Sequence, residues 1–115
     1  MIPDRILLLD VETTGLDATA DTIEVAVCLY SVRHASPISS YSTLIMADAN
    51  AAESINRIPA ELLMAEGENA RLAWSIVAAL AEGAEAFVAH NESFDRAHSD
   101  PEVAALSRLS NQGTR

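Results

Sequence analysis

Three short apolar segments in the first 46 residues constrain the fold of this chain more than any other feature. They occupy residues 5–12, 22–32 and, after a loop at Pro37, 39–46. Runs of this length, rich in Leu, Ile and Val and bounded by polar turns, are typical of strands. The three Leu residues of the first run indicate a strand that is buried on both faces. Because short loops join the segments, we predict an antiparallel three-strand meander.

The composition changes after residue 50, where Ala, Leu and Glu dominate and helices are expected. Pro59 predicts the start of a short helix over 59–66 that ends near Gly67. A longer helix is predicted over 68–82. Its apolar stripe comprises Leu72, Ile76, Val77 and Leu80, and its expected C-terminal cap is Gly83.

A fourth strand is predicted over 84–91, followed by a helix and by a second helix start at Pro101. The order strand, strand, strand, helix, helix, strand, helix is typical of an α/β domain with a mixed sheet. With 115 residues, half of them hydrophobic, the chain is expected to form a single domain over 1–115. We expect its polar end, about 107–115, to be a flexible tail.

The single cysteine, Cys28, excludes an internal disulfide and lies in an apolar run, so we expect it to be buried and inert. A chain without disulfides fits a reducing compartment. No segment approaches the ~20 apolar residues of a membrane helix, and the N-terminus does not resemble a signal peptide. The sequence therefore predicts a cytoplasmic protein with no membrane partner.

The formal net charge is −10, and the chain contains no lysine. This balance argues against sequence-independent binding to long duplexes, which requires a basic surface. It leaves open an enzyme that acts on nucleic acid, because divalent cations bound by carboxylates supply positive charge of their own.

Two carboxylates, Asp10 and Glu12, end the first predicted strand. Residues two apart in a strand share a face, so the two side chains project together. Such a pair repels itself unless one group is protonated or both hold a cation, and Mg²⁺ or Mn²⁺ favours oxygen ligands. Thr13, Thr14 and Gly15 follow and are expected to offer hydroxyls and free backbone N–H groups. The alternative is a strand that merely ends in solvent with two surface acids.

A second group of polar residues follows the fourth predicted strand, in FVAHNESFD at 87–95. Asp95 falls in the first turn of the next predicted helix, beside Phe94, which could pack inward or stack on a base. The alternative is a capped helix in which Asp95 only complements the helix dipole. Alone, this stretch does not decide between the two.

Taken together, DVETTG at 10–15 and HNESFD at 90–95 resemble the first two motifs of the DnaQ-like 3′–5′ exonucleases, the DEDD group. The resemblance implies a ribonuclease H-like fold: a mixed sheet with the three-strand meander, a further strand and flanking helices. It also implies a two-metal site for Mg²⁺ or Mn²⁺, in which Asp10 bridges both ions and Glu12 and Asp95 assist. The implied partner is the 3′ end of single-stranded DNA or RNA, whose phosphodiester bonds are hydrolysed.

The same resemblance implies a set of residues that contact the substrate. Backbone groups around Thr13 and Thr14 would hold the terminal 3′-hydroxyl. The implied apolar wall around the terminal base comprises Leu16, Ile58 and Phe94, and Asn91 completes the substrate-binding set. Asn56 and Arg57 stand where the family often has His and Gly, so a contact on the base side is expected to differ.

The third motif of the family, H-x4-D, is absent, so the C-terminus is interpreted as truncated or rearranged. His98 and Asp100 are spaced H-x-D and are expected to be solvent-exposed rather than a replacement. The missing acid and general base predict weak activity or none, since a general base contributes ~10²–10⁴ in rate. The lost packing would also expose apolar surface, which predicts a homodimer or a partner protein on that face. Two alternatives stay open: a non-catalytic remnant that binds a nucleotide, a metal or a protein, and a site completed by another chain.

Overall fold

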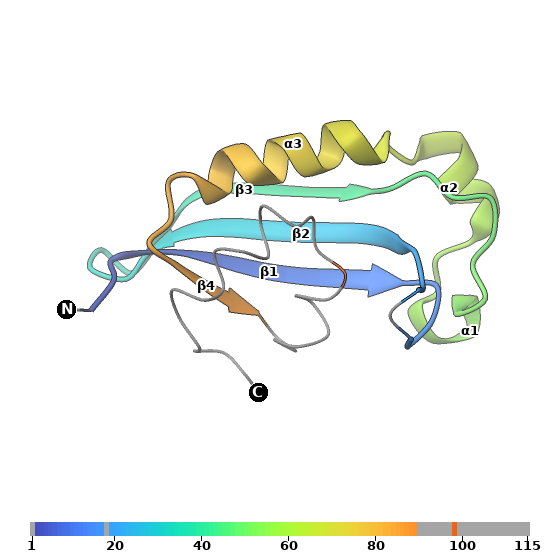
Figure 1. The fold of residues 1–115 in the computed structure, drawn as a ribbon, viewed down its shortest axis with the longest axis horizontal. Helices are drawn as coiled ribbons and strands as arrows, with labels where there is room; N and C mark the ends of the chain where they lie inside the picture. The colour runs from blue at the N-terminus through green and yellow to red at the C-terminus, as the bar shows by residue number, and fades with distance from the viewer. Residues whose placement is uncertain (1, 18, 90–97, 99–115) are drawn as a thin grey trace.

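The computed structural model describes residues 2–17, 19–89 and 98, which form a four-stranded mixed sheet with helices packed on one face and at one end (Figure 1). The strands are β1 Arg5–Thr13, β2 Thr22–Ser31, β3 Ser36–Leu44 and β4 Ala86–Ala89, in the spatial order β3-β2-β1-β4. The first three pair antiparallel, and β4 lies parallel to β1. The predicted meander and the predicted mixed sheet are confirmed.

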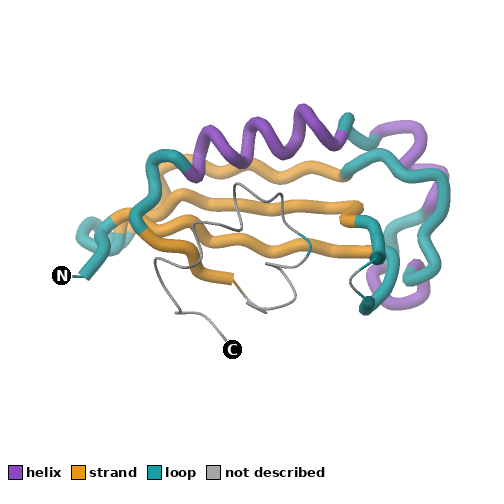
Figure 2. The backbone as a smooth tube through the Cα atoms, in the orientation of Figure 1, coloured by secondary structure: helices purple, strands orange, loops and turns teal. Residues whose placement is uncertain are grey.

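Three helices follow β3, namely α1 Glu53–Asn56, α2 Ala60–Glu66 and α3 Ala70–Ala81. Figure 2 shows α3 running along the sheet, with the two shorter helices beyond the end of β1. α2 and α3 lie inside the predicted ranges, whereas the sequence does not predict the short α1. α3 begins after Asn69, because that side chain accepts a hydrogen bond of 3.1 Å from the Leu72 N–H. No helix among the described residues is long and apolar enough to cross a membrane.

The buried face of α3 differs from the apolar stripe that the sequence predicts. Ala73, Val77 and Ala81 are the buried residues of this helix, while Leu72 is 48% exposed. These buried positions recur every fourth residue, so the helical period is right but the helix is rotated relative to the prediction. The reason is packing: alanine at two of the three positions lets the helix backbone lie close to the sheet, which a face lined by leucine would prevent.

The two faces of β1 are buried unequally. Leu7, Leu9 and Val11 are buried in the main core, which also contains Val77 of α3. Leu8 lies on the other face and stays partly exposed. The expectation that β1 is buried on both faces is therefore wrong for the part of the chain that the structure describes.

The two edges of the sheet are irregular. β3 begins at Ser36 rather than at the predicted residue 39, and it includes Pro37. Proline is tolerated here because β3 is an edge strand, where one side of the backbone needs no ladder partner. At the other edge β4 pairs only with Ile6–Leu9, so the stretch from Asp10 to Thr13 has β2 as its one strand neighbour among the described residues.

Gly67 ends α2 at a point where the chain runs against the segment after β3. The Glu68 N–H donates to the Leu44 carbonyl (2.8 Å), and the Met46 N–H donates to the Glu68 carbonyl (2.9 Å). These bonds hold two backbone segments in direct contact. A Cβ on Gly67 would lie 2.6 Å from the Met46 backbone nitrogen, far inside van der Waals contact.

We therefore expect Gly67→Ala to lower the free energy of unfolding by about 1–3 kcal/mol, because one of the two backbones must move. Urea denaturation measures the change. Gly15→Ala is the matched control, since its Cβ would meet the Ala20 side chain at an ordinary 3.7 Å. Equal losses in the two variants would contradict this explanation.

Candidate functional site

The second half of β1 carries Asp10 and Glu12 on the face of the sheet opposite the main core. The buried residues of β1 are those at odd positions, and both acids lie at even positions, as Leu8 does. Asp10 is exposed and Glu12 is half-buried. The strand therefore gives the two carboxylates a common face, as the alternation of side chains requires.

A third carboxylate, Glu24 of β2, belongs to the same group. Glu24 lies directly opposite Glu12 in the antiparallel pairing of β1 and β2, just before the register shift that follows Glu12. Burial is the largest cause that raises the pKa of Glu12, and the negative charges of Asp10 and Glu24 raise this pKa further. Like charges opposite each other destabilise a sheet, and a bound cation would remove that cost. Nothing in the local sequence pattern around Glu24 reveals the register that places it opposite Glu12.

The raised pKa of Glu12 predicts how stability depends on pH. The folded state binds the Glu12 proton more tightly than the unfolded chain does, so protonation of Glu12 stabilises the fold. This stabilisation is fully present below the ordinary pKa of 4.5. The stabilisation by the Glu12 proton is lost as the pH rises through the raised pKa of the folded state. We expect Glu12→Gln to raise the free energy of unfolding by up to about 1 kcal/mol near neutral pH, and to change little in acid.

Urea denaturation at neutral and at acidic pH, both without divalent metal, measures this difference. Asp48→Asn controls for the loss of one negative charge, because Asp48 is an exposed acid elsewhere on the chain. The same gain in both variants at neutral pH would show that net charge, and not the local group of acids, is responsible.

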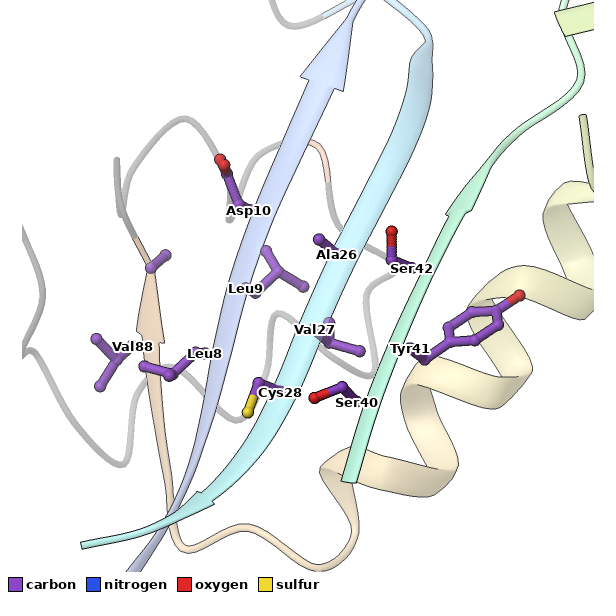
Figure 3. A pocket seen from close by; sticks show the side chains of 11 residues that line it. Leu8, Leu9, Asp10, Ala26, Val27, Cys28, Ser40, Tyr41, Ser42 and Val88 are labelled. Atoms are coloured by element: carbon purple, nitrogen blue, oxygen red, sulfur yellow. The ribbon is translucent and has the colours of Figure 1, made fainter. Parts of the chain in front are cut away.

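A groove with a volume of about 740 Å³ lies beside Asp10 (Figure 3). Its apolar lining includes Leu8, Ala26, Cys28 and Val88, and its polar lining includes Asp10, Ser40 and Ser42. Asp10 is the one carboxylate among the described residues that line it.

Cys28 is half-buried and lines this groove, so the expectation of a buried cysteine is wrong. The reason is its even position in β2, which points it away from the main core.

The loop after β1 uses polar groups that the sequence predicts to be free. The Thr13 hydroxyl donates to the Gly15 carbonyl. The Thr14 N–H donates to the Asp21 carbonyl (2.9 Å), and the Asp21 N–H donates to the Thr14 hydroxyl oxygen (3.0 Å). The expectation of free groups at these positions is therefore corrected: the loop between β1 and β2 closes on its own polar atoms.

The remaining substrate-binding candidates differ in their placement. Leu16 is 88% exposed in this loop. Ile58 is 9% exposed and packs in a second core cluster with Ile23 and Leu63, so its side chain belongs to the fold. Three predicted site residues, Asn91, Phe94 and Asp95, lie outside the described residues, as do Asp100, the predicted helix start at Pro101 and the predicted tail at 107–115.

His98 is buried rather than solvent-exposed, which corrects the expectation from the sequence. Its side chain is 9% exposed, and its Nε2 lies 3.0 Å from the Asp17 carbonyl oxygen. The Thr22 hydroxyl donates to the His98 carbonyl (2.8 Å). Because a carbonyl oxygen can only accept, Nε2 carries the proton in this contact. His98 is therefore attached at the end of the sheet where β1 ends and β2 begins.

Asn56 is a structural feature of the site whose role the sequence does not reveal. Its Nδ2 donates to the Thr13 carbonyl (3.0 Å), which ties the end of α1 to the end of β1. Its Oδ1 accepts from Asn50 Nδ2 (2.9 Å) and from the Ile58 N–H (3.2 Å). Asparagine is common in turns, so no sequence signal distinguishes this bridging role from a local one.

The described residues supply two of the three acids predicted to bind metal. Asp10 and Glu12 offer oxygen ligands on one face, which suits a hard divalent cation. No group of three or more His, Cys, Asp or Glu side chains that could hold a metal ion occurs within residues 2–17, 19–89 and 98. The carboxylate oxygens of Asp10 and Glu12 therefore fit the predicted metal ion. A complete metal site would need at least one further ligand.

No protein-family model matches the chain, and no curated protein matches it in sequence. The fold is nevertheless similar to solved structures of E. coli exonuclease I. The complex with a dT13 oligonucleotide has a TM-score of 0.71 and 18% identity, covering 86% of this chain and 23% of that chain. The complex with a 5cy-dA13 oligonucleotide has a TM-score of 0.72 and 20% identity, covering 84% and 23%. The zinc-bound form of the complex with single-stranded DNA has a TM-score of 0.72 and 17% identity, covering 84% and 22%.

These similarities concern the fold. The predicted fold class, a ribonuclease H-like mixed sheet, is confirmed by the match to exonuclease I. The chain spans less than a quarter of the length of the exonuclease I chains that it matches.

Proposed function

We propose that this chain is a metal-dependent domain of the 3′–5′ exonuclease type, which hydrolyses phosphodiester bonds at the 3′ ends of single-stranded DNA or RNA. The observation that carries the proposal is the placement of Asp10 and Glu12 on one face of β1, where burial and then the charges of Asp10 and Glu24 raise the pKa of Glu12. A divalent cation would offset this repulsion. The similar fold of exonuclease I, solved with single-stranded DNA and with a zinc ion, supports this substrate class and a divalent metal.

In this proposal Asp10 and Glu12 hold two Mg²⁺ or Mn²⁺ ions together with Asp95, which lies outside the described residues. The ions would supply an activated water and stabilise the charge on the leaving oxygen. Asp10, which is exposed at the edge of the groove, and the half-buried Glu12 would both serve as ligands to the metal.

Substrate contacts are assigned to the loop after β1. Leu16 is exposed and apolar, so it can cover the face of the terminal base. We assign the binding of the 3′-hydroxyl to the backbone around Thr13 and Thr14, through polar groups that make no hydrogen bond within the loop. Phe94 and Asn91 complete the proposed surface.

The experiment that tests this function is a ladder assay. A 5′-labelled single-stranded DNA and its RNA counterpart are incubated with the protein and Mn²⁺, and in parallel with a chelator. We expect stepwise shortening from the 3′ end that requires metal and that a 3′-phosphate slows. Equal shortening by an Asp10→Ala protein purified in parallel would identify a contaminating nuclease and overturn the proposal.

The second candidate function is a non-catalytic domain that binds a nucleotide, a metal or a protein. The observation in its favour is that the described residues alone form no three-ligand metal group. Metal-dependent binding of a single-stranded oligonucleotide without any shortening would favour this candidate over the exonuclease.

We also propose that the apolar groove beside Asp10 is covered in a homodimer or by a partner protein. Its lining by Leu8, Ala26, Cys28 and Val88 supports this proposal. Light scattering is expected to give twice the mass of one chain, and a clean monomer would contradict the dimer. We further infer that the chain forms a single cytoplasmic domain.

A further inference from the structure

Arg57 has a backbone conformation that arginine rarely adopts. It ends α1 with φ 62° and ψ 26°, in the left-handed region. Among the described residues only Ala35 shares a positive φ without being glycine. The Cβ atom makes this region unfavourable, and such conformations are concentrated at functional sites. This unfavourable backbone conformation suggests that the Arg57 side chain has a functional role.

The contacts around Arg57 place its backbone near the end of β1. Its N–H donates to the Glu53 carbonyl (2.8 Å) and closes α1. The preceding residue, Asn56, donates to the carbonyl of Thr13, the residue that directly follows Glu12. Arg57 is thus attached to the same end of β1 as the two carboxylates.

The side chain of Arg57 has no stabilising partner within the described residues. It is exposed, and it makes no hydrogen bond or ion pair there, although the net charge of the chain is −10. Two other described arginines, Arg5 and Arg33, lie at the opposite end of β1 and β2. Within the described part of the chain, the Arg57 guanidinium has no partner and is available for a negatively charged ligand.

We propose that Arg57 binds a backbone phosphate of the strand whose 3′ end lies at Asp10 and Glu12. This inference rests on the proposed function. The planar guanidinium can hold phosphate through two parallel hydrogen bonds, and the acids nearby would otherwise repel the strand. Arg57 is therefore a substrate-binding residue whose contact is independent of base sequence.

The test uses Arg57→Gly, which removes the side chain while glycine accepts the same φ without strain. We expect Tm to rise by about 2–5 °C, because the strain is relieved. The Kd for a phosphorothioate single-stranded oligonucleotide with Mg²⁺, measured by fluorescence anisotropy, should rise about tenfold. The slope of log Kd against log salt should fall by about 0.7, the value for one phosphate contact on a single strand.

Arg71→Ala is the matched control, because it makes the same change in net charge at an exposed position on α3. An unchanged Kd in Arg57→Gly, an equal loss in Arg71→Ala, or no binding by the unmodified protein would each overturn the inference. Binding is measured without cleavage, so a protein that binds through Arg57 but never shortens the strand would overturn the exonuclease proposal alone.

Discussion

Asp10→Asn is expected to lower the rate of metal-dependent shortening by about 100-fold or more. Loss of one group that stabilises developing charge costs ~10²–10³ in kcat. Asparagine has nearly the shape of aspartate but no negative charge, so it would hold a divalent cation poorly. The rate is measured on a 5′-labelled single strand at saturating Mn²⁺.

The same variant should be slightly more stable than the parent without metal, because Asp10 contributes to the repulsion that raises the pKa of Glu12. Added Mn²⁺ should raise the Tm of the parent and leave the variant almost unchanged, since binding to the folded state stabilises it. Asp48→Asn is the control for net charge. Full activity in Asp10→Asn, or an equal Mn²⁺ shift in both proteins, would show that Asp10 does not hold the metal.

Phe87→Ala is expected to lower the free energy of unfolding by about 3–5 kcal/mol, a large part of the ~5–15 kcal/mol of a typical domain. Phe87 is fully buried in the main core, and it pairs with Leu7 across β4 and β1. Its truncation would leave a cavity in the main core that holds β4 against β1.

Urea denaturation of Phe87→Ala and Val88→Ala makes the comparison within one strand. Val88 lies on the other face and is only partly buried, so its truncation should cost much less. A loss below about 1 kcal/mol for Phe87→Ala would mean that β4 contributes little to the core.

The sequence predicts the fold well where a short-range pattern determines the element. The alternation in β1 and β2 is enough to place Asp10 and Glu12 on one face. Ala73 and Ala81 show the limit: hydrophobic period suggests a leucine-lined face for α3, whereas the fit to the sheet selects the small side chains. α1 escapes prediction because a helix of four residues contains too little periodicity to detect.

The candidate site is predictable only in part, for a related reason. Asp10 and Glu12 are neighbours along one strand, so their relation is local. Strand register brings Glu24 to the same end of β1, and a side-chain hydrogen bond brings Asn56 there. No local sequence pattern predicts either placement. The free backbone N–H group expected at Thr14 is not found, because the loop after β1 uses it in a hydrogen bond to the Asp21 carbonyl.

The short β4 has a mechanical consequence for β1. β4 pairs only with Ile6–Leu9, so the first half of β1 is hydrogen-bonded to a strand on each side. Among the described residues, the second half of β1 has a paired strand on one side only. Amide hydrogens in the first half should exchange with solvent slowly, while those of the second half should open at lower free energy. Within the described residues, the two acids therefore lie on the half of β1 that is expected to open more easily. Their separation should therefore adjust to the radius of a cation more easily than the spacing of side chains on the first half of β1.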